Sequence, residues 1–282
     1  MTIPLKKLAV IKTLVFVFAL ATLITLSCAH GPYHVTNKEY RDLSRTYAKQ
    51  LRALPSISPN DSILLPGYFA GTVNFNLRKP HFVILHHTAQ ESCEKTLKTF
   101  IDKKREVSAH YVICKDGTVH YILNDYFRAW HSGVSKWGNV SDVNSTSIGI
   151  ELDNNGTDSF PQQQVNALIA LLGTLKSSYN IPTNNFIGHG DIAPGRKVDP
   201  NVRFPWQLLA TKGFGPWYGD TTALVVPENF NSSIALRIIG YDVSRQHESI
   251  QAFRRHFLGS ENVGSLTEPE MKVLYSLMLR FL

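Results

Sequence analysis

The sequence predicts an α/β fold in which a mixed β-sheet is flanked by helices, followed by a small all-α C-terminal domain. Two observations support the mixed sheet. Short β-branched and apolar runs alternate with amphipathic helical stretches between residues 77 and 215. Two of these runs flank Lys115-Asp116-Gly117, a turn typical of a β-hairpin, so at least two strands should be antiparallel. A third observation supports the helical domain, because helical patterns dominate after residue 227.

Residues 1–28 have the pattern of a secretory signal. A start with three lysines precedes an uncharged stretch from Thr13 to Ala29, which is short for a membrane-spanning helix of about 20 apolar residues. Cys28 near the end of this stretch makes it resemble a bacterial lipoprotein signal, in which the cysteine becomes the lipidated first residue. The resemblance implies a lipid anchor in a membrane. Ordinary cleavage and an uncleaved anchor helix are the alternatives.

The neighbours of Cys28 bear on this interpretation. Lipoprotein signals prefer Leu three residues before the cysteine, whereas this chain has Thr25 there and Leu26 one place late. Ala29, rather than Asp, follows the cysteine, which resembles sorting to the outer membrane of Gram-negative cells. We therefore expect lipidation at Cys28 and a location in the bacterial cell envelope, on the periplasmic face of the outer membrane.

Residues 29–76 should form a helix and a linker. Apolar side chains recur with a spacing of four within residues 36–54, which predicts a helix with one apolar face. These side chains are Leu43, Tyr47 and Leu51. The stretch that follows, residues 55–62, is rich in Pro and Ser and is expected to be the linker.

Residues 77–215 should form the main domain. Strands are expected at residues 81–88, 109–114, 118–123, 147–152 and 185–188. Helices are expected at residues 92–104 and 162–179. The longer helix follows Pro161, a residue favoured in the first turn, and its apolar residues recur at helical spacing.

Residues 227–282 should form the helical domain, with helices at residues 234–239, 245–257 and 267–281. The last of these opens with Thr267 and has Glu270 three residues later, the pattern of a capping box. No set of candidate catalytic residues is visible in this part of the sequence.

Charge and cysteine content narrow the class of protein. The formal net charge is +7, but three lysines belong to the signal, and no run of basic residues suited to phosphates is present. We therefore expect no nucleic-acid partner, while a mild positive bias suits an anionic polymer or membrane surface. Cys93 and Cys114 remain if Cys28 carries lipid. An oxidising compartment permits a disulfide between them, although their spacing does not show that they approach.

Two short segments carry the candidate chemistry. His86-His87-Thr88-Ala89 ends the first predicted strand, and residues 189–200 read H-G-D-I-A-P-G-R-K-V-D-P. Together they offer two imidazoles and a carboxylate, the ligand types that hold zinc while leaving one position open for hydrolysis. His86 and His87 point to opposite faces of a strand, so only one of them can be a ligand.

Spacing alone leaves alternatives for every ligand of this candidate site. Asp191 competes with Asp199 for the carboxylate position. The rival imidazoles are His110, His120 and His131. Two further groups have uncertain roles: Trp130 and His131 either line a groove or pack in the interior, and Arg196 either contacts an acidic group of a substrate or caps a carbonyl.

Five segments in a fixed order resemble one known family. They are residues 86–89 (HHTA), 108–111 (SAHY), 129–133 (AWHSG), 147–152 (SIGIEL) and 189–200. This succession resembles the zinc-dependent N-acetylmuramoyl-L-alanine amidases, the type 2 amidase family shared with peptidoglycan recognition proteins. Within this family, the lipoprotein signal and the helical domain at residues 227–282, called the tail below, are most similar to those of the AmiD lipoprotein branch. The resemblance covers residues 77–215 densely and the tail more weakly.

The resemblance implies a role for each site residue. The zinc ligands would be His86, His189 and Asp199. Glu151 would move protons, and its apolar neighbours on the strand should raise its pKa, as that role requires. Lys197 lies two residues from Asp199 and would stabilise the oxyanion of the tetrahedral intermediate.

The sequence therefore predicts a zinc amidase that cuts the bond between N-acetylmuramic acid and L-alanine in peptidoglycan or muropeptides. Its helical tail resembles a peptidoglycan-binding-like module, and no obligate protein partner is evident. The alternative is a non-catalytic peptidoglycan recognition or binding lipoprotein, and a phage-type lysin is a second rival. The presence of all five site residues favours an enzyme over a binder, and the lipoprotein signal argues against a lysin.

Overall fold

The computed structural model describes residues 31–52, 74, 76–77 and 79–282. The predicted signal with Cys28 and the predicted linker at residues 55–62 lie outside the described residues. The chain forms two separate units, residues 1–74 and 75–282. In the first unit the predicted helix is present as α2 (His34–Arg52), which has no buried residue. None of the helices in the described ranges combines the length and the apolar character needed to cross a bilayer.

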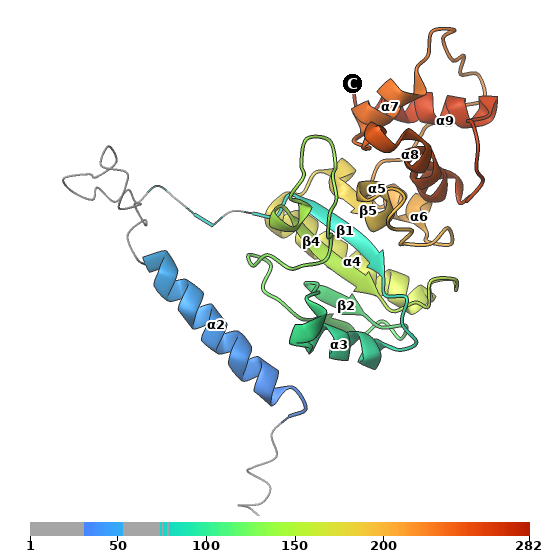
Figure 1. The fold of residues 1–282 in the computed structure, drawn as a ribbon. Coiled ribbons are helices and arrows are strands. Elements are labelled where there is room, and N and C mark those ends of the chain that lie inside the picture. Colours follow the sequence, from blue (N-terminus) through green and yellow to red (C-terminus); the bar gives the residue numbers. More distant parts are fainter. Residues whose placement is uncertain (1–30, 53–73, 75, 78) are drawn as a thin grey trace, which may run out of the picture. The chain divides into compact units, whose positions relative to one another are not determined.

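The second unit is built on a five-stranded sheet with the order β3-β2-β4-β1-β5 (Figure 1). Its strands are β1 (Phe82–His87), β2 (Tyr111–Ile113), β3 (Val119–Tyr121), β4 (Ser147–Leu152) and β5 (Phe186–Gly188). Strand β1 lies in the centre and pairs in parallel with β4 and β5, and β2 pairs in parallel with β4. The β2–β3 hairpin is antiparallel. The predicted mixed sheet is therefore confirmed.

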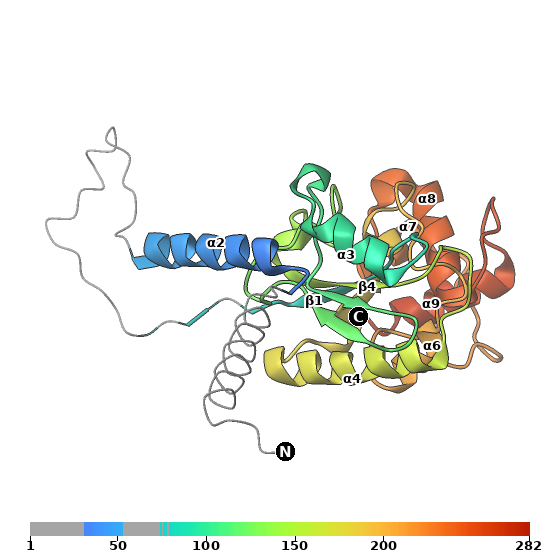
Figure 2. The ribbon, with the colours of Figure 1, turned by 90° about the horizontal axis from the view of Figure 1, so that it is seen from below.

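One face of the sheet is a continuous apolar layer under α4 (Gln162–Tyr179), and we call it the α4 face. Strand β4 contributes Ile148, Ile150 and Leu152 to it, because alternate side chains of a strand share a face. The helix packs its own buried leucines against them, as its apolar stripe predicts. Figure 2 shows α4 on one side of the sheet and α3 (Cys93–Ile101) and α8 (Gln246–Phe253) on the other.

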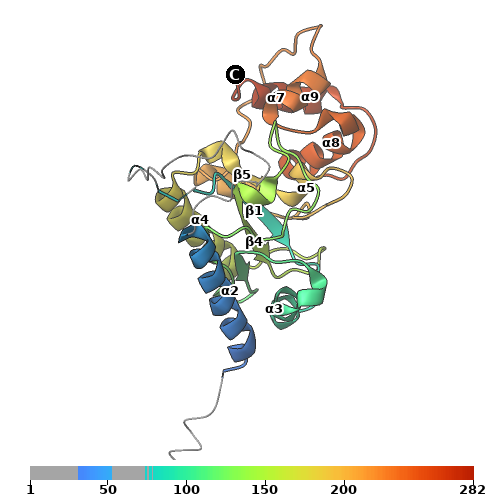
Figure 3. The ribbon, with the colours of Figure 1, turned by 60° about the vertical axis from the view of Figure 1, so that its left-hand side comes forward.

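The opposite face is covered in part by the C-terminal helices, which gather beyond α5 (His189–Ile192) at one end of the sheet (Figure 3). These helices are α7 (Ser232–Ile239), α8 (Gln246–Phe253) and α9 (Glu268–Met278). Phe82, Ile84 and Ile187 of the sheet belong to the same hydrophobic core as Leu236, Phe253 and Leu274 of the tail. The tail and the sheet therefore share one core.

Local capping explains where helices depart from the predicted ranges. Helix α3 begins after Ser92, whose side chain accepts a hydrogen bond from the Lys95 amide. It ends at Ile101 rather than at Lys104, because the Asp102 side chain caps a separate 3-10 turn over Lys103–Arg105. Helix α8 continues into a π-helical turn at Arg254–Leu258.

Other local features of the chain match the sequence pattern or add short elements to it. The capping box of α9 is present, since the Thr267 amide donates to the Glu270 carboxylate. A short helix, α6 (Trp206–Thr211), precedes the tail. Cys93 and Cys114 form a disulfide with their Cα atoms 5.4 Å apart, which ties the start of α3 to the end of β2.

Candidate functional site

The end of β1 presents its two histidines to different faces of the sheet. His86 lies beside Glu151 of β4 in the strand register, so both side chains project from the opposite face. Their closest atoms, His86 Nδ1 and Glu151 Oε1, are 4.0 Å apart. His87 projects to the α4 side, where its Nδ1 accepts a hydrogen bond from the Asn201 amide at 3.2 Å. His86, the ligand that the resemblance implies, therefore shares a face with Glu151, whereas His87 does not.

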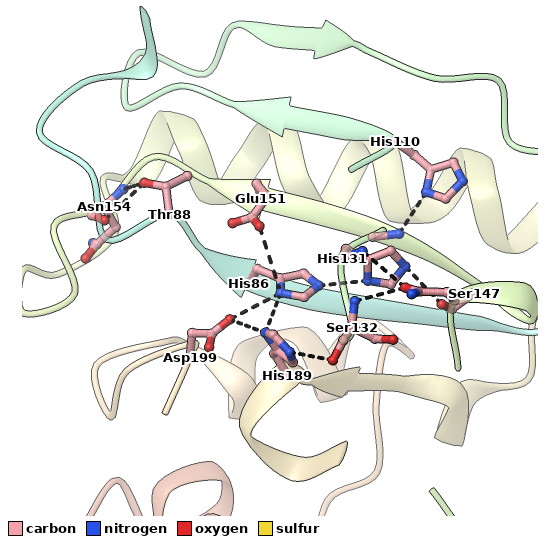
Figure 4. A network of polar contacts seen from close by, with 12 residues as sticks. His86, Thr88, His110, His131, Ser132, Ser147, Glu151, Asn154, His189 and Asp199 are labelled. Carbon is pink, nitrogen blue, oxygen red and sulfur yellow. Dashed lines mark hydrogen bonds and ion pairs between the residues drawn. The ribbon is translucent and has the colours of Figure 1, made fainter. Parts of the chain in front are cut away.

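The second segment returns two of its side chains to His86. His189 opens α5 directly after β5, and the Gly190 amide donates to the Asp199 carbonyl at 2.7 Å, which closes the loop. The Nδ1 atoms of His86 and His189 lie 2.9 Å apart, and Asp199 Oδ2 lies 3.2 Å and 3.0 Å from them (Figure 4). All three residues are buried.

This triangle fits a small divalent cation. A tetrahedral zinc ion with bonds of about 2.0–2.2 Å separates its ligand atoms by roughly 3.3–3.6 Å, so a slight opening of the observed triangle accommodates it. Burial and the neighbouring His189 lower the pKa of His86 to about 4, which keeps that imidazole neutral. Burial opposes ionisation of Asp199, but its contacts with His189 and His86 hold its pKa well below the usual range. Two imidazole nitrogens and a carboxylate oxygen therefore face one point, an arrangement that a bound cation would stabilise.

The rival carboxylate has other partners. Asp191 Oδ2 accepts hydrogen bonds from the Gly188 amide at 2.9 Å and from His256 Nδ1 at 2.6 Å. Its other oxygen accepts from the Tyr241 hydroxyl at 2.7 Å. Asp191 therefore ties the second candidate segment to the tail, and both of its carboxylate oxygens have other partners.

The rival imidazoles are placed elsewhere as well. His110 Nδ1 accepts from the Gly149 amide, and its Nε2 donates to the Phe127 carbonyl. His131 lies behind His86 and contacts its Nε2 atom at 3.1 Å. In the described part of the chain, one other group of His, Cys, Asp or Glu is close enough to hold a metal, namely Cys93, Cys114 and His120. Its two sulfur atoms are joined in the disulfide, which leaves a single ligand.

Glu151 has the properties of a proton acceptor. Burial and the charge of Asp199 raise its pKa to about 8, although Lys197 opposes the shift. Its Oε2 atom is buried without a hydrogen-bond partner. The residue lines the same cavity as the three ligand candidates.

The cavity in front of these residues measures about 370 Å³. Lys197, which is half-buried, and Trp130, which is 52% exposed, both line it. The sequence left open whether Trp130 and His131 line a groove or pack in the interior. Both line this cavity, and His131 is also buried. Arg196 donates to the carbonyls of Ser132 and Val134 at 2.5 Å and 3.0 Å, which matches the capping alternative.

The sequence patterns did not single out several residues that support this site. The Ser132 carbonyl accepts from His189 Nε2 at 3.1 Å, and Ser147 contacts His131. Gly149 inside β4 is a sequence signal that could have indicated close packing on this face, because an isolated glycine in a strand often marks a close approach.

The comparisons with known proteins agree with this geometry. A family model described as N-acetylmuramoyl-L-alanine amidase matches residues 76–202. The N-acetylmuramoyl-L-alanine amidase AmiD of Escherichia coli K12 is 34% identical over 206 residues, which cover 62% of this chain and 74% of that protein. The 1,6-anhydro-N-acetylmuramyl-L-alanine amidase AmpD of Salmonella typhimurium SL1344 is 44% identical over 101 residues, which cover 36% and 54% of the two chains.

Solved structures show the same similarity. A complex of E. coli AmiD with anhydro-N-acetylmuramic acid-L-Ala-D-gamma-Glu-L-Lys superposes with a TM-score of 0.65 at 28% identity, covering 74% of this chain and 93% of that one. AmpDH3 from Pseudomonas aeruginosa, in complex with an anhydromuramic pentapeptide, has a TM-score of 0.64 at 28% identity. That match covers 81% of this chain and 99% of the other.

Proposed function

Since this chain belongs to the N-acetylmuramoyl-L-alanine amidase family, we propose that it is a zinc enzyme that hydrolyses the amide bond between N-acetylmuramic acid and L-alanine in peptidoglycan or muropeptides. The observation that carries the proposal is the convergence of His86, His189 and Asp199 beside an unsatisfied Glu151 in one cavity. A binding protein needs no such set, so the enzyme is favoured over a non-catalytic recognition lipoprotein.

The residues of the cavity divide the chemistry between them. Zinc held by His86, His189 and Asp199 would supply a Lewis acid for the attack of water on the amide carbonyl. Glu151 would take a proton from the attacking water and return it to the departing nitrogen, a role for which a pKa of about 8 is well placed. The Lys197 ammonium would stabilise the negative charge that develops on the carbonyl oxygen.

Isosteric changes of the two carboxylates test the ligand assignment. Asp199→Asn should lower the zinc content of the purified protein, whereas Asp191→Asn should keep zinc bound while reducing stability. Mass spectrometry of the products from anhydro-N-acetylmuramyl-L-Ala-D-γ-Glu-L-Lys, with and without a chelator, identifies the bond that is cut. Release of a free tripeptide that begins with L-Ala supports the proposal, and cleavage at another bond or undiminished turnover without metal would refute it.

We also propose that Cys28 carries a lipid that anchors the enzyme on the periplasmic face of the outer membrane. The support comes from the sequence, where an uncharged stretch follows basic residues and ends at this cysteine. Metabolic labelling with a fatty-acid probe should mark the wild-type chain and leave Cys28→Ala unlabelled. Equal labelling of the two proteins would rule out this anchor.

A further inference from the structure

A row of buried polar contacts runs from His86 back into the protein. His86 Nε2 lies 3.1 Å from His131 Nδ1, and His131 Nε2 lies 3.1 Å from the Ser147 hydroxyl oxygen. The Ser147 hydroxyl in turn donates to the Val143 carbonyl at 2.6 Å. All three side chains are buried, and Figure 4 shows them in line behind the ligand triangle.

The carbonyl at the end of the row fixes the direction of every hydrogen bond in it. The Val143 carbonyl can only accept, so the single Ser147 proton is committed to it and the Ser147 oxygen must accept from His131 Nε2. With its proton on Nε2, the His131 ring carries its lone pair on Nδ1. That lone pair accepts the proton of His86 Nε2, which leaves the lone pair of His86 Nδ1 directed at His189 and Asp199.

We infer that His131, fixed by Ser147, is a positioning residue that selects the tautomer and ring orientation of His86 required for metal binding. This inference rests on the proposed zinc site. The partner of a metal-bound histidine commonly acts in this way, by accepting the proton of the nitrogen that does not face the metal. The proton on His189 Nε2 is accepted in the same way by a main-chain carbonyl, that of Ser132. Arg196 also lies 3.3 Å from His189 Nε2, but the acceptor facing that nitrogen is a main-chain carbonyl, whereas the acceptor facing His86 is a side chain that a substitution can remove.

Residues from other parts of the chain hold His131 in place. Its ring fills the space where residue 149 would carry a Cβ atom, because a Cβ built on Gly149 would lie 2.4 Å from His131 Cγ. The glycine in the middle of β4 is therefore required by the imidazole packed against it. The Asn144 side chain accepts from the amides of His131 and Ser132, at 3.1 Å and 2.9 Å, and so fixes the backbone of this segment.

Zinc affinity, measured by competition with a chromophoric chelator, tests this role without recourse to catalysis. His131→Phe keeps a buried ring but offers no acceptor, and it should weaken zinc binding about 10- to 100-fold, the usual effect of losing such a partner. His131→Asn places an amide oxygen near the position of Nδ1 and should recover most of the affinity. Cobalt substitution gives a second readout, because a tilted His86 should alter the visible absorption of His131→Phe but not of His131→Asn.

His110→Phe is the matched control, since His110 is also a buried imidazole beside Gly149 but contacts none of the three ligand candidates. It should lower the melting temperature as His131→Phe does, yet keep zinc affinity within about threefold of the wild type, well inside the range expected for a lost partner. If His131→Phe does not fold, Ser147→Ala takes its place, and a several-fold loss of affinity is expected.

Two outcomes would overturn the role of His131. One is wild-type affinity in His131→Phe, or in Ser147→Ala where that variant replaces it. The other is an equal loss in His131→Phe and His110→Phe. A wild-type chain that binds no zinc would instead overturn the proposed function, and the role of His131 with it.

Discussion

The two faces of β4 differ in almost every respect although they belong to the same six residues. On the α4 face, Ile148, Ile150 and Leu152 are fully buried in an apolar layer. On the opposite face the strand presents Ser147, Gly149 and Glu151 to the candidate site. Ser147 accepts from His131 in the row of hydrogen bonds, Gly149 makes room for His131, and Glu151 lies beside His86. On β4, therefore, the side chains of the α4 face stabilise the fold, and those of the opposite face belong to the candidate site.

The elements that cover the two faces differ in the same way. Helix α4 covers its face with leucines, whereas the tail meets the opposite face through an apolar core and a set of polar contacts. Tyr241 and His256 of the tail hold Asp191, two residues from the ligand candidate His189. The face that presents the candidate site is therefore also the face whose covering helices make contacts through ionisable side chains.

The largest effect is expected from Glu151→Gln, which removes the proposed proton acceptor and keeps its shape. The variant should retain zinc and its fold while turnover falls by about 10²–10⁴, the usual span for general acid–base catalysis. Steady-state rates on a soluble muropeptide, measured beside zinc content, check this. Full activity in this variant would show that another group moves the proton.

A change at Ile150, the neighbour of Glu151 on the α4 face, should lower stability and leave activity nearly unchanged. Ile150→Ala removes buried methyl groups from the layer under α4 and should cost about 2–5 kcal/mol of unfolding free energy, because the cavity collapses only in part. Zinc affinity and turnover of the folded protein should stay near wild type. Urea unfolding of the metal-free chain measures the loss, and a collapse of zinc affinity at unchanged stability would contradict the division between the faces.

Much of this division can be predicted from the sequence. The alternation S-I-G-I-E-L predicts a strand with one apolar face, and the strand and the long helix have the predicted bounds, residues 147–152 and 162–179. Period-2 and period-3.6 patterns are strong in both because each buries one side against a large neighbour. The three ligand candidates also lie together as the resemblance implied.

The sequence could not predict contacts between distant positions that have ordinary residue types. The partners of Asp191 lie 50 and 65 positions further along the chain, and nothing near them marks such a contact. The tail contains no catalytic candidate, which by itself would predict that the active domain can dispense with it. Its side chains nevertheless share a core with Ile84 and Ile187, so removing the tail would expose the sheet beside the site.

The smallest of the three expected effects should come from an ion pair within the tail, which covers part of the opposite face. Arg254 is fully buried and donates to both carboxylate oxygens of Glu270, at 2.8 Å and 2.9 Å. The hydrogen bond with Arg254 lowers the pKa of Glu270 from 4.5 to about 2, despite an opposing effect of burial. A carboxyl group whose pKa is lower in the folded chain stabilises that chain above the unfolded value of 4.5 and loses this contribution as the pH falls to about 2.

Glu270→Gln should therefore cost about 1–3 kcal/mol of unfolding free energy at neutral pH, a range reduced to allow for solvent screening at the partly exposed carboxylate. The difference from wild type should shrink as the pH falls from 4.5 to about 2, because the wild-type carboxyl group then takes up its proton. Denaturant titrations at several pH values measure it. Glu268→Gln is the control: its carboxylate is 74% exposed and pairs with Lys272, so its loss should cost little at any pH. A penalty for Glu270→Gln that does not change with pH would show that ionisation of Glu270 does not stabilise the tail.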